Sequence, residues 1–254
     1  MAVAGVPHEC LEASRNAELS PAQRRRAEKL IATRISTRAP LAYLLGEAWL
    51  GEYRFHVDER AIVPRSFIAE LMRERLHPWV RNPRSVKTAL DMCTGSGCLA
   101  VLLALAFRGA RVDAVDASHA ALAVARRNIR DYRLERRVRT VRSDLFEKLA
   151  GTRYDLILAN PPYVTDRGMR SLPMEYRHEP VQALSGGSDG LDLVRRILRE
   201  APTHLVPRGL LIVEIGHNRP ALERAFPRLA FTWVETSAGD GLVFMLTREQ
   251  LLRA

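Results

Sequence analysis

The sequence predicts an α/β fold in which a doubly wound, mostly parallel sheet of seven strands ends in an antiparallel hairpin. From residue 85 onward, short apolar runs alternate with helical stretches, which is typical of βαβ units and a parallel sheet. The last two apolar runs flank a turn containing Asp240-Gly241, a strong hairpin signal. A chain of 254 residues that is 47% hydrophobic is long enough for one large domain with a small appendage.

The first 84 residues differ from this alternating pattern. A helix is expected over 17–38, because Ser20-Pro21 provides an N-cap followed by a first-turn proline, and Pro40 should end it. The β-prone runs 48–50 and 53–57 flank Gly51-Glu52 and predict a hairpin, followed by a helix over 67–76. The chain is therefore divided into an N-terminal helical region (1–40), a β-hairpin linker with a helix (41–84) and a main domain (85–254).

The main domain is predicted to hold seven strands and four helices. The strands are expected over 86–92, 111–117, 138–143, 154–160, 209–215, 231–235 and 242–247. The helices are expected over 98–107, 120–131, 191–200 and 220–225. The segment 164–187 shows no regular period and receives no assignment.

Composition narrows the class of protein. The net charge of +10 is spread over nearly every segment without a cluster, which leaves two interpretations: a solvated basic surface, or contact with RNA or a ribonucleoprotein. The sequence contains neither a run of about 18 apolar residues nor the start of a signal peptide, so a cytoplasmic protein is expected. Cys10, Cys93 and Cys98 fit no disulfide framework or ligand spacing, so reduced thiols and no metal site are expected.

A glycine-rich loop, Asp91-Met92-Cys93-Thr94-Gly95-Ser96-Gly97, joins the first strand of the main domain to its first helix, where open parallel sheets place their ligand crevice. Gly95 and Gly97 allow a tight turn and a close approach to a ligand. Asp116 ends the next strand, where a carboxylate can accept hydrogen bonds from two ribose hydroxyls; a helix N-cap is the alternative. The loop lacks the third glycine of the dinucleotide fingerprint and no Gly-Lys-Ser/Thr follows, so neither NAD nor a nucleoside triphosphate is favoured.

Ser143-Asp144-Leu145-Phe146 follows the third strand and continues the same crevice. Asp144 could accept a hydrogen bond from the exocyclic amine of adenine, with Leu145 against the ring; a cap for the next turn is the alternative. Three successive strand ends thus carry a glycine-rich loop, a carboxylate for the ribose (Asp116) and a carboxylate for the adenine amine (Asp144). This set fits S-adenosylmethionine better than other cofactors. The predicted cofactor-binding residues are Asp91, Cys93, Thr94, Gly95, Ser96, Gly97, Asp116, Ala117, Asp144, Leu145, Phe146 and Asn160.

The fourth strand ends in Asn160-Pro161-Pro162-Tyr163. Both prolines lack an N–H and have a fixed φ, so the carbonyls here cannot enter a regular ladder. A rigid rim of acceptors beside an aromatic ring results, and it predicts a pocket that grips an NH2 group. A proline-terminated strand followed by an ordinary turn is the alternative.

This four-residue motif resembles the signature of amino-methyltransferases that act on planar NH2 groups of glutamine, adenine or guanine. Together with the segments 63–71, 91–97, 143–146 and 172–180, it resembles the protein-glutamine N5-methyltransferases from about Arg34 to the C-terminus. The branch that modifies the third protein of the large ribosomal subunit ranks ahead of the release-factor branch, which has Pro-Arg-Pro-x-Thr-Glu where this chain has Pro64 to Glu70. The resemblance implies a class I S-adenosylmethionine-dependent methyltransferase fold and a ribosomal protein partner, with contact to ribosomal RNA or an assembly intermediate as a further implication.

For a glutamine substrate, the residues expected to act are Asn160, Pro161, Pro162 and Tyr163. The Asn160 side-chain oxygen and the Pro161 carbonyl should accept the two amide N–H groups, while Pro162 and Tyr163 wall the amide plane. His178 is expected to be a structural loop residue, because the reaction needs no general base before transfer. A nucleic-acid amino-methyltransferase is the strongest rival, but it would require an added recognition domain or a concentrated basic groove.

Overall fold

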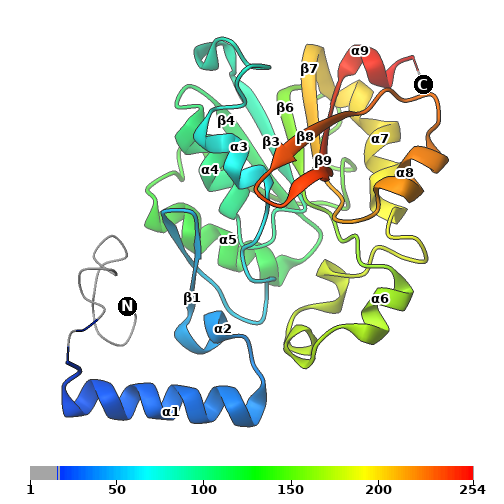
Figure 1. Cartoon of the computed structure of the whole chain (residues 1–254). Coiled ribbons are helices and arrows are strands. Elements are labelled where there is room, and N and C mark those ends of the chain that lie inside the picture. The colour runs from blue at the N-terminus through cyan, green and yellow to red at the C-terminus, as the bar shows by residue number, and fades with distance from the viewer. Residues whose placement is uncertain (1–15, 17, 254) are drawn as a thin grey trace.

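The computed structural model describes residue 16 and residues 18–253, and it confirms the predicted sheet (Figure 1). The strand order is β5-β4-β3-β6-β7-β9-β8, with β9 antiparallel to both of its neighbours and the other pairs parallel. The strands are β3 (Thr88–Met92), β4 (Arg111–Asp116), β5 (Val138–Arg142), β6 (Tyr154–Ala159), β7 (Leu205–Glu214), β8 (Thr232–Thr236) and β9 (Gly239–Thr247).

Helices cover both faces of this sheet and create two hydrophobic clusters. Along β6, Leu156 and Leu158 belong to one cluster, whereas Ile157 and Ala159 belong to the other. Because successive side chains point to opposite faces, a strand that is covered on both sides has apolar residues at nearly every position. The helices are α3 (Ile68–Arg73), α4 (Cys98–Ala106), α5 (His119–Asp131), α6 (Asp166–Ser171), α7 (Asp192–His204), α8 (Arg219–Ala225) and α9 (Arg248–Leu251).

The N-terminal part begins with a long exposed helix. Helix α1 (Pro21–Thr37) starts at the predicted cap: the Ser20 hydroxyl accepts the N–H of Gln23, and the Gln23 side chain accepts the N–H of Ser20. A short helix, α2 (Leu41–Leu45), follows Pro40 and was not predicted. The predicted hairpin is confirmed: β1 (Glu47–Leu50) pairs with β2 (Tyr53–His56) across Gly51-Glu52.

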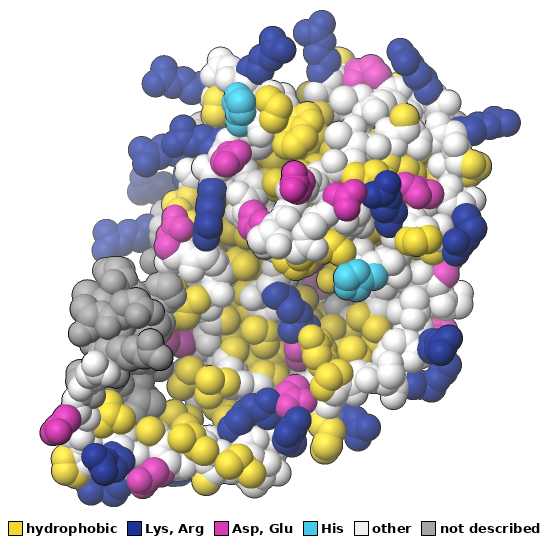
Figure 2. Space-filling view, viewed as in Figure 1, with side chains coloured by type: hydrophobic (Ala, Val, Ile, Leu, Met, Phe, Trp, Pro, Cys, Tyr) yellow, Lys and Arg dark blue, Asp and Glu magenta, His cyan; other side chains and the backbone are white. Residues whose placement is uncertain are grey.

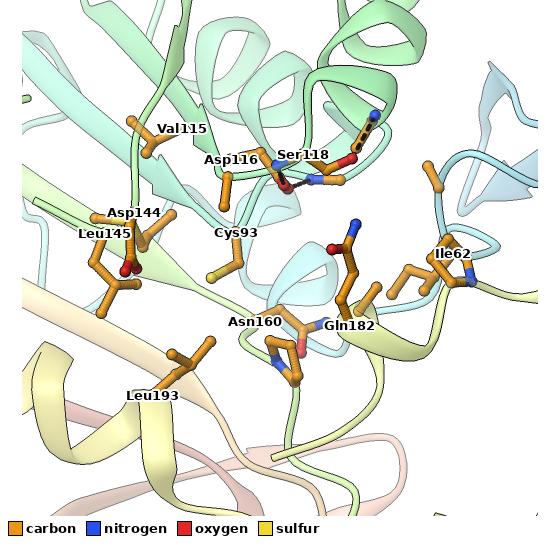
Figure 3. A pocket seen from close by; sticks show the side chains of 18 of the residues that line it. Ile62, Cys93, Val115, Asp116, Ser118, Asp144, Leu145, Asn160, Gln182 and Leu193 are labelled. Carbon is orange, nitrogen blue, oxygen red and sulfur yellow. Dashed lines mark hydrogen bonds between the residues drawn. The ribbon is translucent and has the colours of Figure 1, made fainter. Parts of the chain in front are cut away.

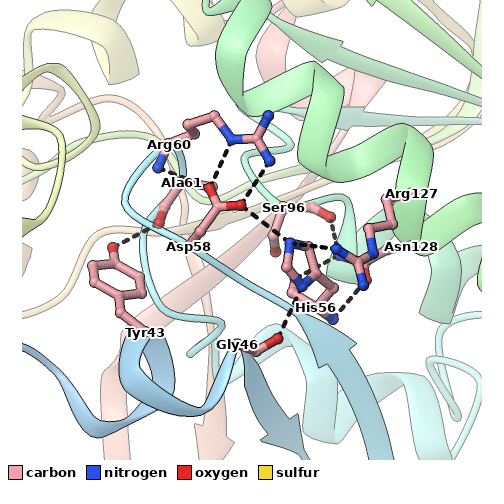
Figure 4. Close-up of polar contacts among 9 residues, drawn as sticks. All are labelled: Tyr43, Gly46, His56, Asp58, Arg60, Ala61, Ser96, Arg127 and Asn128. Atoms are coloured by element: carbon pink, nitrogen blue, oxygen red, sulfur yellow. Dashed lines mark hydrogen bonds and ion pairs between the residues drawn. The ribbon is translucent and has the colours of Figure 1, made fainter.

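A buried asparagine joins this hairpin to the glycine-rich loop (Figure 4). Asn128 of α5 is 1% exposed, and its Oδ1 accepts the backbone N–H of His56 at 2.7 Å. Its Nδ2 donates to the carbonyl of His56 at 2.9 Å and to the carbonyl of Ser96 at 2.8 Å. One side chain therefore satisfies three backbone groups from two segments, which positions the loop relative to the hairpin.

The C-terminal hairpin forms, but the predicted turn at Asp240-Gly241 is wrong. Thr236 pairs with Gly239, so Ser237 and Ala238 form the loop, and Asp240-Gly241 lies within β9. A tertiary contact stabilises this loop, since the Glu70 carboxylate accepts the N–H of Ser237 at 2.8 Å and its hydroxyl at 2.5 Å. Gly241 has φ +91°, and a Cβ there would lie 3.0 Å from Cδ of Arg219, so glycine is needed for a close approach in the strand.

Other predicted bounds shift. β7 begins at Leu205 and α7 runs to His204, so both are longer than expected, whereas α3 ends at Arg73. The unassigned segment 164–187 contains α6 and the 3-10 helices Met174–His178 and Val181–Ala183. No helix within the described residues is both long and apolar enough to cross a membrane.

Replacing the buried asparagine should destabilise the protein. Asn128→Ala leaves backbone groups of His56 and Ser96 without partners, and we expect a loss of about 2–4 kcal/mol in the free energy of unfolding, measured by urea denaturation. The exposed Arg130→Ala in the same helix is the control and should change it by less than about 0.5 kcal/mol. Equal effects of the two substitutions would contradict the role of Asn128.

Candidate functional site

A cavity opens at the carboxyl ends of β3, β4, β5 and β6 (Figure 3). The cavity, together with the space in it that is open to solvent, measures about 720 Å³. The predicted residues that line it are Cys93, Gly95, Asp116, Ala117, Asp144, Leu145, Asn160 and Pro162. The predicted residues that lie outside the lining are Asp91, Thr94, Ser96, Gly97, Phe146, Pro161 and Tyr163.

The glycine-rich loop turns sharply after β3. Cys93, Gly95 and Gly97 all have positive φ, and a Cβ at Gly95 would point into open space. By contrast, a Cβ at Gly97 would lie 2.9 Å from Cβ of Ala125, so this glycine permits close packing of the loop against α5. The two glycines therefore differ: Gly95 leaves room in the cavity, whereas Gly97 lets two backbone segments approach.

Asp91 is a fully buried carboxyl group beneath this loop. The Thr94 hydroxyl donates to its Oδ2, while its Oδ1 has no hydrogen-bond partner among the described residues. Burial raises the pKa of Asp91 to about 7, although the Thr94 bond opposes this shift. Asp91 therefore supports the loop from below and is absent from the surface of the cavity.

Asp116 ties the loop to the next strand end. Its Oδ2 accepts the N–H of Gly95 at 2.8 Å, and its Oδ1 accepts the N–H of Ser118 at 2.8 Å. Ser118, whose hydroxyl accepts the N–H of Ala121, is the N-cap of α5, so Asp116 does not cap that helix. Burial raises the pKa of Asp116, whereas the hydrogen bonds from the two backbone N–H groups act to lower it. Each carboxylate oxygen keeps a second acceptor position for a ligand.

Asp144 lies on another wall of the cavity, and it is paired. Arg196 Nη1 of α7 lies 3.0 Å from Oδ1 and 3.1 Å from Oδ2. The side chain does not cap the following turn, where the backbone carbonyl of Asp144 accepts the N–H of Glu147. Leu145, which follows with φ +45°, is buried beside the cavity.

The end of β6 presents a side-chain amide to the cavity. Nδ2 of Asn160 donates a long hydrogen bond to the carbonyl of Arg65 at 3.4 Å, which favours the orientation in which Oδ1 is the end of the amide without a partner. Neither Oδ1 of Asn160 nor the Pro161 carbonyl accepts a hydrogen bond from the described residues. Oδ1 of Asn160 therefore remains available to a donor in the cavity, whereas Pro161 is buried and lies outside the cavity lining.

Tyr163 packs behind this strand end. Its hydroxyl donates to Oε1 of Glu214 at 3.3 Å, and burial raises its pKa. Its carbonyl accepts Nδ2 of Asn218 at 2.7 Å. Gly216 has φ +54°, and a Cβ there would lie 2.7 Å from the Tyr163 ring, so glycine is required for this contact.

Glu179 anchors the segment 172–184 beside the cavity. Its carboxylate, 5% exposed, accepts Nη1 and Nη2 of Arg65 at 2.8 Å each, and the Arg65 guanidinium lies 4.9 Å from the centre of the Tyr176 ring. His178 is exposed, and its Nε2 lies 2.9 Å from the carbonyl of Thr37 in α1. The structural interpretation of His178 therefore agrees with its contacts.

Sequence reasoning missed several residues of the site. Met92 and Ser143 also line the cavity and belong to segments that the sequence placed at the crevice, although neither was among the predicted binding residues. The other additional lining residues are Arg60, Ala61, Ile62, Val115, Ser118, Ala121, Pro180, Gln182, Ala183 and Leu193. Glu214 was also missed, although the rule that identified Asp116 applies to it, because it is an acidic residue at the end of a predicted apolar strand. Cys93 and Cys98 are free thiols, whereas Cys10 lies outside the described residues.

Comparisons with known proteins agree on one class of enzyme. The family model of the methyltransferase small domain matches residues 71–175. The chain is 54% identical to the ribosomal protein uL3 glutamine methyltransferase of Bordetella pertussis, over 97% of this chain and 83% of the relative. It is 52% identical to the protein of the same name from Neisseria meningitidis, over 97% of this chain and 81% of the relative. A solved methyltransferase from Pyrococcus furiosus, 17% identical with a TM-score of 0.52, covers 87% of this chain and 98% of its own, and has the same fold.

The raised pKa of Asp91 should make the stability of the protein without ligand depend on pH. The folded state keeps this proton up to about pH 7, whereas the unfolded chain loses it near its ordinary value of 3.8. The contribution of the Asp91 carboxyl to the free energy of unfolding is therefore complete below about pH 4 and is lost as the pH rises through about 7. Asp91→Asn should raise Tm relative to the unmodified protein by more at pH 8 than at pH 5. The exposed Asp131→Asn is the control, and a Tm difference for Asp91→Asn that does not change with pH would contradict the account.

Proposed function

The chain belongs to the family of ribosomal protein uL3 glutamine methyltransferases, and we propose from this membership that it methylates the side-chain amide nitrogen (N5) of a glutamine in uL3. It is a methyltransferase with the class I fold. The methyl donor in this proposal is S-adenosylmethionine. A cytoplasmic location is part of the same proposal, since ribosomal proteins are made and assembled there.

The residues around the cavity fit this donor. Gly95 leaves open space at the loop, and Asp116 and Asp144 supply acceptors for hydroxyl and amine groups. Carboxylates also suit a ligand with a positively charged sulfonium. When bound, S-adenosylmethionine supplies a methyl group that is already strongly electrophilic. The proposed binding residues are those predicted from the sequence, with Asp91, Thr94, Ser96 and Gly97 shaping the loop from behind.

The orientation of Asn160 is the observation that carries the proposal. Because its Nδ2 is bonded to the Arg65 carbonyl, its Oδ1 is left to accept an N–H of the substrate amide. The Pro161 carbonyl accepts the second N–H, and Pro162 and Tyr163 limit the amide plane. An amide nitrogen shares its lone pair with its carbonyl and attacks poorly, so holding it in place is the main contribution of these residues.

The same acceptors account for the choice of glutamine. An ionised glutamate carboxylate has no donor for Oδ1 of Asn160 or for the Pro161 carbonyl, and two acceptors facing a carboxylate would repel it. No general base is required before transfer, since the alkylated nitrogen becomes acidic and can release its proton to water. We also propose the division of the chain at residues 40 and 84, with α1 and the segment 41–84 helping to receive a protein substrate.

A labelling experiment separates this function from its rivals. The protein is incubated with methyl-labelled S-adenosylmethionine and, in separate reactions, unmethylated uL3, an unmethylated release factor, DNA or RNA. We expect label in uL3 at a glutamine, located by mass spectrometry. Label in the release factor alone would support the sibling activity, and label in nucleic acid alone would overturn the proposal.

Removal of the amide should separate binding from turnover. Asn160→Ala should reduce kcat about 10²–10³-fold, as is typical when one group that stabilises the transition state is lost. The affinity for S-adenosylmethionine, measured by calorimetry, should change by less than about threefold, because other residues provide most of that site. Asn82→Ala, at the exposed N-cap of the 3-10 helix Pro83–Ser85 and outside the cavity lining, is the matched control. Unchanged turnover in Asn160→Ala would disprove the amide-binding role.

A further inference from the structure

Basic residues gather at the edge of the sheet that lies opposite the cavity. Lys87 and Arg153 directly precede β3 and β6, Arg111 begins β4, and Arg136-Arg137 precede β5. Since these four strands are parallel neighbours, their amino-terminal ends meet at one edge. Figure 2 shows Lys and Arg side chains standing out along the upper border of the molecule, where β7 begins in Figure 1.

A groove lies within this basic edge. Four of its lining residues are arginines: Arg111, Arg136, Arg137 and Arg139. Asp113 in the groove is already occupied, because its carboxylate accepts Nε and Nη2 of Arg139 at 2.9 and 2.7 Å and the Tyr154 hydroxyl at 2.7 Å. Glu135 is the remaining acidic residue in the lining. The groove therefore carries an excess of positive charge.

Four of these cations form no ion pair with a described residue, whereas Arg137 donates hydrogen bonds to the carbonyls of Arg108 at 3.0 Å and Ala104 at 2.8 Å. Lys87, Arg111, Arg136 and Arg153 are exposed, and none forms an ion pair with a described residue. The nearby Asp155 carboxylate is occupied by the N–H groups of residues 87 and 88 and by the Thr88 hydroxyl. Unpaired, exposed cations around a groove are the electrostatic footprint of a phosphate-binding surface.

We propose that this basic edge, through the exposed side chains of Lys87, Arg111, Arg136 and Arg153, binds the phosphate backbone of RNA. The choice of RNA rests on the proposed function, because a ribosomal protein is one that assembles with ribosomal RNA, which makes RNA the polyanion associated with the proposed substrate. Arginine side chains on strand ends and turns contact phosphates without reading bases, so binding here depends on charge and not on sequence. The edge would hold the enzyme close to its substrate during assembly.

The position of the basic edge separates this role from base methylation. The parallel strands have five or six residues, so their two ends are about 17–20 Å apart. RNA held at the amino-terminal ends does not place a base beside Asn160 at the carboxyl end of β6. The basic residues are dispersed along the sequence, and the parallel topology brings several of them to one edge of the sheet.

The test measures RNA binding by fluorescence anisotropy with a labelled RNA duplex of about 20 base pairs over a series of salt concentrations. The variant combines Arg111→Gln, Arg136→Gln and Arg153→Gln. The control combines Arg25→Gln, Arg224→Gln and Arg228→Gln, which removes the same charge from exposed arginines that form no ion pair with a described residue. Thermal unfolding checks that both proteins remain folded.

We expect the edge variant to bind the RNA at least about tenfold more weakly at 100 mM salt. The slope of the logarithm of the affinity against the logarithm of the salt concentration should become shallower by about three, one for each phosphate contact removed. The control should lose less than about threefold. Equal losses in both variants, no binding by the unmodified protein, or stronger binding to a DNA duplex than to RNA would overturn the proposal.

Methylation of free uL3 is measured in parallel, and it should be the same in the edge variant and the unmodified protein. If the unmodified protein does not methylate uL3 but the edge variant alone loses RNA binding, the proposed function fails and the RNA-binding surface stands. Loss of uL3 methylation in the edge variant would contradict the separation of the two sites.

Discussion

The carboxylate of Glu214 lies at the end of β7 and joins three segments that are far apart in the sequence. Its Oε2 accepts the Ser66 hydroxyl at 2.6 Å and the Phe67 N–H at 2.9 Å, and its Oε1 accepts the Tyr163 hydroxyl. Glu214 is 2% exposed, and burial raises its pKa, so these donors must compensate for lost water. Because the neighbouring Arg65 carbonyl holds Nδ2 of Asn160, the open acceptor at the cavity depends on this buried group.

A second carboxylate extends this arrangement to the N-terminal helix. Glu179 binds the Arg65 side chain, so the segment that fixes Asn160 is held from two directions. Three residues separate Glu179 from Glu175, whose Oε1 lies 2.7 Å from Nη2 of Arg34 in α1 and 2.6 Å from Nη2 of Arg38, the C-cap of that helix. Helix α1 is therefore connected through a short segment to Arg65, whose carbonyl contacts Asn160.

The sequence predicted the elements whose formation depends on residues that are close to one another along the chain. The alternation of apolar runs, the Ser20-Pro21 cap and the hairpin at Gly51-Glu52 follow from local preference and are confirmed. The partners of Glu179 and Glu214 could not be predicted, since Arg65 and Ser66 lie 114 and 148 residues away from them. The turn at Ser237-Ala238 was missed for the same reason, because Glu70 stabilises it from another element. Roles of the site residues in binding and transfer remain proposals, for which the Asn160 geometry is the main support.

A structure of the ternary complex tests the central claim most directly. The protein would be crystallised with S-adenosylhomocysteine and a uL3 peptide that contains the methylated position as unmodified glutamine. The account predicts the glutamine amide nitrogen within hydrogen-bond distance, about 2.7–3.2 Å, of both Oδ1 of Asn160 and the carbonyl of Pro161. A glutamine amide bound elsewhere, or Asn160 rotated so that Nδ2 faces the substrate, would contradict it.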